Sequence, residues 1–370
     1  MRTGIDRNWP YRRGVRISTR TLNRTYLRRQ LLLDDVPNTV PDAVGRLVAV
    51  QAQEVDAPYV GLWARLPGFT HGELTAALED RSVVRGGLLR GTQHLTTAED
   101  YRWLRPLIRA GMGNAGLSAF RRQIEGLELA EIAAAATEAL AGRTMTRPQL
   151  ARALGERFPG REAIALAWAA QHQLSLVHPP PSGTWGRRGH VHVTLAEEWI
   201  GAPLRESTAE ELLWRYLASC GPATAADLQI WSGVRRLRDA VEALRPRLRV
   251  YRDEAGRELF DAPDLDLADP DEPAPVRFLP EFDNLVLSHD DRGRIIASAA
   301  DRALVCPGYS IVRPTFLVDG FVAGTWSAEP GRLVVAPFRP LADPAPVHAE
   351  ALRLLEFLRL TDAEVVLEER

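Results

Sequence analysis

The sequence predicts an α+β protein, with tandem winged-helix (helix-turn-helix) motifs followed by a small C-terminal antiparallel β-barrel. Helical patterns followed by two short strands around a marked turn recur three times, at a spacing of roughly ninety residues. Beyond an acidic stretch, the spacing of short strand candidates indicates a small antiparallel barrel, which a last helix covers. We therefore expect a basic, poorly structured N-terminal extension (1–19), winged helices 1 to 3 (20–112, 113–204 and 205–265), an acidic linker (266–275) and the barrel with its terminal helix (276–370).

The first winged helix is organised around the sequence Val50-Gln51-Ala52-Gln53. Upstream, Thr39-Val40-Pro41-Asp42 predicts a helix start, with a hydroxyl cap, a proline in the first turn and an acid near the exposed N–H groups. Gln51 falls on the apolar face of this helix, where its amide needs hydrogen-bond partners. The amides of Gln51 and Gln53 reach a common point only if the helix ends near Gln51 and the chain becomes extended, because side chains then alternate with a period of two.

The remaining elements follow from capping residues, helical spacing and turn signals. In winged helix 1 we expect helices from Thr19 and after Thr70, and strands at 82–85 and 90–96 around a turn at Gly86-Gly87. In winged helices 2 and 3 we expect helices at 130–140, 145–151, 164–173, 210–218, 224–228 and 234–244, and strands at 174–177, 190–194, 248–251 and 258–260. In the barrel we expect strands at 276–279, 284–287, 294–297, 315–318, 321–325 and 333–335, and a helix at 348–360.

Composition indicates a soluble globular protein of more than one domain, with 370 residues, 45% of them hydrophobic and 25% charged. No apolar run is long enough to span a bilayer, so we expect a cytoplasmic protein that associates with the nucleoid through DNA. Cys220 and Cys306 are far apart and lack metal-ligand spacing, and His190 and His192 have no further ligands near them. We therefore predict no metal ion and no cofactor.

The basic residues are unusual because all 46 are arginine and none is lysine. The absence of lysine excludes an internal Schiff-base lysine and a P-loop lysine. Arginines crowd the N-terminus and recur from Arg235 to Arg252, directly before the acidic stretch. Such stripes suit a surface that tracks phosphates, and they are equally typical of solvated faces, so both interpretations stay open.

Several segments, in order, resemble the AlkZ/YcaQ-type winged-helix DNA glycosylases. They are Val50-Gln51-Ala52-Gln53 with Pro58-Tyr59 and Gly61–Arg65, Leu89–His94, Leu279–Asn284 with Ser288-His289 and Arg292, and Val318–Trp326. The resemblance runs from about Thr19 to the end of the chain. The family's signature is glutamine, one apolar residue, then glutamine or aspartate, and Gln51-Ala52-Gln53 resembles the AlkZ branch. Gly91 and Gln93, in the hairpin segment, depart from the family's usual residues.

The resemblance implies a monofunctional DNA glycosylase that hydrolyses the N-glycosidic bond of N7-alkylated purines, bulky or crosslinked, in double-stranded DNA. A role in repair, or in self-resistance to a genotoxic natural product, would follow. The chemistry is consistent with two neutral amides, because a guanine alkylated at N7 is already cationic and its glycosidic bond is weakened. Amides that position water and face the developing positive charge of the sugar then suffice. Hydrolysis by water also suits a chain without lysine, since a strand-cleaving glycosylase normally needs an amine.

The candidate catalytic residues are Gln51 and Gln53. Candidate contacts with substrate or DNA are His94, Thr92, Arg90, Arg235, Arg236, His289 and Arg292. Structural alternatives stay open: a satisfied amide pair at a helix end, a core histidine on a strand, and turn residues at a hairpin. Glu281 and Asp283 resemble a carboxylate pair, and they also suit a turn in which they cap backbone N–H groups.

Two other functions remain open for the whole chain. It could be a winged-helix DNA-binding protein or transcriptional regulator whose glutamines are structural, or a non-catalytic damage-binding protein. A regulator usually dimerises to read spaced half-sites, and the sequence has no coiled coil or other dedicated dimer helix. We therefore expect a monomer.

Overall fold

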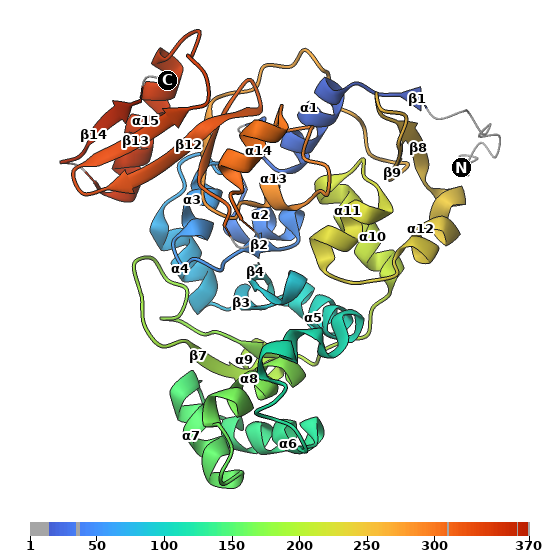
Figure 1. The fold of residues 1–370 in the computed structure, drawn as a ribbon, viewed down its shortest axis with the longest axis vertical. Helices are drawn as coiled ribbons and strands as arrows, with labels where there is room; N and C mark the ends of the chain where they lie inside the picture. The colour runs from blue at the N-terminus through green and yellow to red at the C-terminus, as the bar shows by residue number, and fades with distance from the viewer. Residues whose placement is uncertain (1–14, 35–37, 309–310, 361, 369–370) are drawn as a thin grey trace, which may run out of the picture.

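The computed structural model describes residues 15–34, 38–308, 311–360 and 362–368 (Figure 1). The expected extension lies outside these residues up to position 14. Val15–Arg16 form strand β1, and Ser18 caps helix α1 (Thr19–Arg29) with its side chain. Residues 15–19, which the sequence placed in the extension, therefore include a strand and the start of a capped helix. Among the described residues, no helix is long and apolar enough to cross a bilayer.

The glutamine sequence lies among short elements near the centre of the molecule (Figure 1). These are α2 (Val40–Leu47), β2 (Val50–Gln51), α3 (Ala57–Trp63), α4 (His71–Glu79), β3 (Val83–Gly87), a 3₁₀ turn (Leu89–Gly91), β4 (Gln93–Thr97), α5 (Ala98–Met112) and a 3₁₀ segment (Gly113–Phe120). Thr39 and Asp42 form a reciprocal capping box at the start of α2, as predicted, and Thr70 and Glu73 do the same for α4.

A second group of helices forms the lower end of the molecule in Figure 1 and has an apolar core of its own. It consists of α6 (Leu129–Leu140), β5 (Met145–Thr146), α7 (Arg147–Arg157), α8 (Ala163–Gln173), β6 (Leu176–Val177), β7 (His192–Leu195) and α9 (Ala196–Ile200). Three helices and two strands occur in the predicted order, and α7 begins with the predicted threonine cap and proline. Assignment of these elements to the winged-helix fold stays a prediction.

The strands of the first two groups join into one six-stranded sheet, in the order β2-β4-β3-β6-β7-β5. Gly86 of β3 pairs with Val177 of β6, so the two hairpins meet there. A Cβ atom at Gly86 would lie 2.8 Å from the ring of Tyr101 and 3.0 Å from the carbonyl oxygen of Leu176, so only glycine allows this approach. The predicted turn at Gly86-Gly87 is therefore wrong, and the chain turns at Leu89–Gly91 instead.

The third group packs beside α1. It comprises α10 (Ala209–Cys220), α11 (Ala225–Ser232), α12 (Arg238–Leu244), a 3₁₀ turn (Arg245–Arg247), β8 (Arg249–Arg252) and β9 (Glu258–Asp261). β8 pairs antiparallel with β9 and parallel with β1. The predicted helix at 234–244 is shorter than expected, so Arg235 and Arg236 lie in the loop between α11 and α12.

The C-terminal sheet is open, so the predicted closed antiparallel barrel is wrong. Its elements are β10 (Arg277–Leu279), α13 (Asn284–Leu287), α14 (Ala299–Val305), β11 (Thr315–Val318), β12 (Phe321–Glu329), β13 (Arg332–Pro337), α15 (Ala345–Leu358) and β14 (Glu364–Leu367). The strands follow the order β10-β11-β12-β13-β14, and β14 pairs parallel with β13. Because α15 carries the chain back along the sheet before β14 begins, β10 and β14 stay at opposite edges and cannot close it.

Two predicted barrel strands are absent. Residues 284–287 form helix α13, because the side chain of Asp283 accepts a hydrogen bond from the N–H of Leu285 and caps that helix. Residues 294–297 form no strand. The predicted acidic linker is held against α1, since the backbone of Pro270 and Glu272 accepts hydrogen bonds from Arg20 and Arg24.

A buried ion pair joins α3 to the C-terminal part. Both nitrogens at the end of the Arg65 side chain donate to the carboxylate of Asp283, at 2.9 and 2.8 Å. Both side chains are at most 4% exposed, so water does not screen the pair. The pair fixes the position of α13 relative to the first group.

Replacing Asp283 by asparagine leaves the charge of Arg65 buried without a partner. We expect Asp283→Asn to lower the free energy of unfolding by about 3–5 kcal/mol, measured by urea denaturation. Glu329→Gln, which breaks the exposed pair between Glu329 and Arg332, is the control and should cost at most about 1 kcal/mol. A loss for Asp283→Asn as small as the control's would contradict the burial of this pair.

Candidate active site

Strand β2 places Gln51 at the centre of the site. Helix α2 ends at Leu47, and Val48 follows with φ 67°, a strained conformation for a β-branched residue. The chain is then extended, and Gln51 pairs with His94 of β4. The predicted change from helix to extended chain before Gln51 is confirmed.

Gln51 is 6% exposed and is held at both its backbone and its side chain. Its N–H donates to Oδ1 of Asn284, at 3.2 Å, and Nδ2 of Asn284 donates to the carbonyl of Ala49. Its side-chain Oε1 accepts from Arg90 at 3.0 Å, and its Nε2 donates to the hydroxyl of Thr92 at 3.2 Å. The amide of Gln51 therefore has one fixed orientation.

Gln53 lies beside Gln51 with its side chain exposed. Its Oε1 accepts from the backbone N–H of Gln93 at 3.4 Å. Since Gln51 contacts Thr92 and Gln53 contacts Gln93, the two amides meet consecutive residues of the same hairpin. One amide is buried and fixed, and the other faces solvent.

Arg90 and His94 support Gln51 from the hairpin. One guanidinium nitrogen of Arg90 donates to the carbonyl of Trp231, and the other lies 3.0 Å from Oε1 of Gln51 and 3.3 Å from Nε2 of His94. Because Nδ1 of His94 donates to the carbonyl of Thr92, its Nε2 is the acceptor. Burial holds the pKa of His94 well below its usual value, so the ring is neutral at pH 7. Burial lowers the pKa of Arg90 to about 10, which leaves it charged.

Within the described part of the chain, none of the other predicted contact residues hydrogen-bonds to this group. His289 is 2% exposed, its Nε2 donates to the carbonyl of Cys220, and burial lowers its pKa to about 3. It is a core residue after α13 rather than part of a hairpin. Arg292 donates to Sγ of Cys306. Its charge lowers the pKa of Arg90, so Arg292 lies near the Arg90 side of the site. Arg235 and Arg236 are exposed.

The expected carboxylate pair is divided between two environments. Asp283 is used by Arg65 and by the cap of α13. Glu281 is half-buried, and burial raises its pKa, with a further contribution from the negative charges of Glu54 and Asp56. Glu281, Glu54 and Asp56 therefore form an acidic group next to Gln53. No cluster of three or more potential metal ligands occurs among the described residues.

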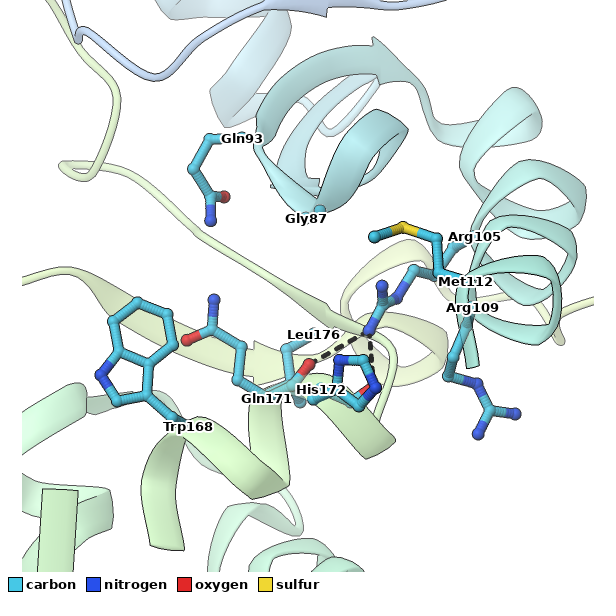
Figure 2. Close-up of a pocket in the computed structure, with 10 residues that line it drawn as sticks. Gly87, Gln93, Arg105, Arg109, Met112, Trp168, Gln171, His172 and Leu176 are labelled. Atoms are coloured by element: carbon cyan, nitrogen blue, oxygen red, sulfur yellow. Dashed lines mark hydrogen bonds between the residues drawn. The ribbon is translucent and has the colours of Figure 1, made fainter. Parts of the chain in front are cut away.

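A cavity of about 110 Å³ lies between the β3–β4 hairpin, α5 and α8 (Figure 2). Gln93 points into it from the hairpin, opposite Trp168 and Gln171 of α8. Gln93 and His94 are neighbours on β4, so their side chains point to opposite faces of the sheet. Because His94 pairs with Gln51, the cavity lies on the face opposite Gln51.

A family model described as DNA glycosylase AlkZ-like matches residues 44–357. The chain belongs to this family. It is therefore a DNA glycosylase, a hydrolase of N-glycosyl bonds that acts on DNA, as the sequence resemblance predicted. The chain is 25% identical over 360 residues to an interstrand DNA cross-link repair glycosylase of Streptomyces sahachiroi, covering 87% of this chain and 91% of that protein. The structure of Streptomyces sahachiroi DNA glycosylase AlkZ matches 96% of this chain and 100% of its own, with a TM-score of 0.80 and 22% identity, which supports the mixed α+β fold.

Sequence reasoning overlooked three features of this glycosylase. Asn284 belongs to one of the segments that resemble the family. Its contact with Gln51 of β2 has no local signal, because the two residues are 233 positions apart in the chain. Arg85 ends a predicted strand, and nothing in its spacing indicates that its charge is buried. The exposed pair Arg187-Arg188 lies outside both arginine-rich stretches, and its flanking glycines are the signal that marks it as a loop.

Proposed function

We propose that this glycosylase hydrolyses the N-glycosidic bond of N7-alkylated purines in double-stranded DNA, with Gln51 and Gln53 as catalytic residues and water as the nucleophile. The observation that carries the proposal is the pair of adjacent amides, one fixed by Arg90 and Thr92 and the other open to solvent. The chain has no lysine to form a Schiff base with the sugar, so the proposed activity is monofunctional.

The proposed chemistry needs no proton donor for the leaving base, and the attacking water releases its proton to solvent as the sugar hydroxyl forms. Alkylation at N7 makes the base cationic, so the base leaves as a neutral molecule while positive charge develops on the sugar. The open hydrogen-bonding groups of Gln53 hold a water molecule at the sugar carbon. The amide of Gln51 keeps its orientation throughout, so it needs no reorganisation during the reaction. Neutral His94 acts as a support for Arg90 rather than as an acid.

The charges around the pair favour this reaction. Glu54 follows Gln53 in the chain, and Glu281 is close enough for the charge of Glu54 to raise its pKa. Carboxylates close to the exposed amide of Gln53 would stabilise an oxocarbenium-like sugar. Arg90 is largely buried and directed at Oε1 of Gln51, while Arg188 is close enough to Glu281 to lower its pKa.

We extend the proposal to bulky and interstrand-crosslinked N7 adducts, acted on by a monomer as part of repair or self-resistance to a genotoxic natural product. The exposure of Gln53 supports this, because a reaction at the open end of the pair does not require the base to enter a deep pocket. The Streptomyces relative that is named for interstrand DNA cross-link repair supports the crosslinked substrate.

The test is single-turnover release of N7-methylguanine from a defined duplex. We expect release by the wild type, and a loss of about 10²-fold or more in Gln51→Ala and Gln53→Ala with duplex binding retained, because each removes one positioned amide. Gln149→Ala, which removes an amide that caps α7, is the control and should keep the full rate. The same assay with a bulky adduct and with an N7–N7 crosslink tests the extension. Intact duplex binding without release from any of these lesions would favour a non-catalytic DNA-binding protein.

We also propose that two exposed arginine pairs bind phosphates on either side of the glutamines. In the two arginine-rich stretches, eight of the described arginines form ion pairs: Arg20, Arg24, Arg28, Arg29, Arg245, Arg247, Arg249 and Arg252. For Arg187, Arg188, Arg235 and Arg236, no carboxylate of a described residue lies within ion-pair distance, so their charges are available to phosphates.

Hydrogen bonds and packing connect the loops that carry the two arginine pairs to the elements around the glutamines. The loop that carries Arg187-Arg188 is fixed by Trp185, which packs on His71, and by the N–H of Gly186, which donates to Asp56 at 2.7 Å. Arg235-Arg236 follow α11, whose Trp231 accepts a hydrogen bond from Arg90. In the view of Figure 1, the loop before β7 and the α11–α12 loop lie on either side of β2 and β4.

Replacing both arginines of either pair by glutamine is expected to weaken duplex binding. It should also reduce the slope of log K against log salt concentration by about 1–2, because binding releases about one counterion fewer for each phosphate contact that is lost. Arg247→Gln, in which the lost charge is already paired with Glu210, should leave the slope unchanged. A slope that stays the same in both double variants would place the DNA elsewhere.

A further inference from the structure

Arg85 is a buried arginine without a carboxylate partner. It lies on β3, is 5% exposed, and no carboxylate of a described residue lies within ion-pair distance of it. Burial lowers its pKa to about 10, so it remains charged at neutral pH. Burying an unpaired charge costs several kcal/mol of stability, so a role other than packing is expected of it.

The guanidinium of Arg85 is directed at the peptide between the two glutamines. Its Nε and Nη2 both donate to the carbonyl of Ala52, at 3.3 and 2.9 Å. Its Nη1 donates to Nδ1 of His178 at 3.0 Å; burial keeps the pKa of His178 well below its usual value, so the ring is a neutral acceptor. A Cβ atom at Gly183 would lie 2.6 Å from Cδ of Arg85, so this glycine leaves room for the side chain.

Arg85 takes the place of a strand partner for the carbonyl of Ala52. β2 ends at Gln51, and the N–H of Ala52 still donates to the carbonyl of Gln93. Among the described residues, no backbone N–H donates to the carbonyl of Ala52. Arg85 pairs with Leu95, and Leu95 pairs with Val50, so Arg85 lies on the sheet face opposite Gln51. It therefore does not reach a substrate that contacts Gln51.

We propose that Arg85 is a positioning residue, which fixes the peptide between Ala52 and Gln53 and thereby directs the amide of Gln53 toward the reacting sugar. This inference rests on the proposed catalytic role of the glutamines. A rotation of this peptide moves the Gln53 side chain by an ångström or more, and a displacement of about 1 Å costs about 10²-fold in rate. His178 and Gly183 belong to the segment that carries Arg187-Arg188, so one segment supports both Arg85 and the proposed phosphate contact.

Arg105 provides a matched control within the same chain. It is 7% exposed, and like Arg85 it donates to backbone carbonyls, here those of Gln171, His172 and Leu174 at the end of α8. Burial lowers its pKa as well. It differs from Arg85 in having no contact with the glutamine segment, so it reports the cost of losing a buried arginine as such.

The experiment compares Arg85→Met, Arg85→Lys and Arg105→Met in single-turnover release of N7-methylguanine at saturating enzyme, with duplex affinity and melting temperature measured on the same preparations. We expect Arg85→Met to lose about 10²-fold in rate with unchanged affinity, and Arg85→Lys to recover part of the rate because one donor still reaches the Ala52 carbonyl. Arg105→Met should lower the melting temperature and keep the rate.

A full rate in folded Arg85→Met, or equal rate losses in Arg85→Met and Arg105→Met, would overturn the inference. If Arg85→Met does not fold, Arg85→Lys decides: a rate equal to the wild type's overturns the inference, and a reduced rate at unchanged affinity supports it. Failure of the proposed function has a different result. In that case either no protein, the wild type included, releases the base, or Gln53→Ala is as active as the wild type.

Discussion

The hydrogen bonds of Asn284 are the interaction on which the site depends. β2 is an edge strand of the six-stranded sheet, so one side of its backbone has no strand partner. The Asn284 amide supplies an acceptor to the N–H of Gln51 and a donor to the carbonyl of Ala49, as a neighbouring strand would. Asn284 in turn is the first residue of α13, which Asp283 caps and Arg65 anchors. The C-terminal part of the chain thus completes a strand that begins near residue 50.

The two glutamines are held by different means. Gln51 is fixed from three directions, by Asn284 at its backbone and by Arg90 and Thr92 at its amide. Gln53 is exposed, and its position follows from the backbone before it and from the N–H of Gln93. Arg90 is largely buried and contacts Oε1 of Gln51, while Glu54 follows Gln53 in the chain and raises the pKa of Glu281. Negative charge beside the exposed amide suits a reaction in which the sugar becomes positive and the base leaves neutral.

Local signals in the sequence predicted local structure well. Thr39, Thr70 and Thr146 cap helices as expected, and the change from helix to extended chain before Gln51 follows from the need to bring two amides together. These features depend on neighbours within a few residues, which is why they can be read from one sequence.

The failures of prediction came from one overlooked cap and from distant contacts. Three apolar residues follow Asn284 and suit a strand, but capping by Asp283 makes residues 284–287 a helix. Gly86 resembled a turn glycine and is instead a point of close approach to Tyr101. The open C-terminal sheet depends on the parallel return of β14 after α15. Arg85 and Asn284 contact the glutamine segment across the fold, so no sequence spacing reveals them.

The most direct test of this account is a double-mutant cycle between Asn284 and Gln51, measured as single-turnover excision rate on an N7-alkylated duplex. If Asn284 acts by holding β2, Asn284→Ala slows excision without weakening duplex binding, and the double variant is no slower than Gln51→Ala alone. Rate losses that add in the double variant, or a full rate in Asn284→Ala, would contradict it.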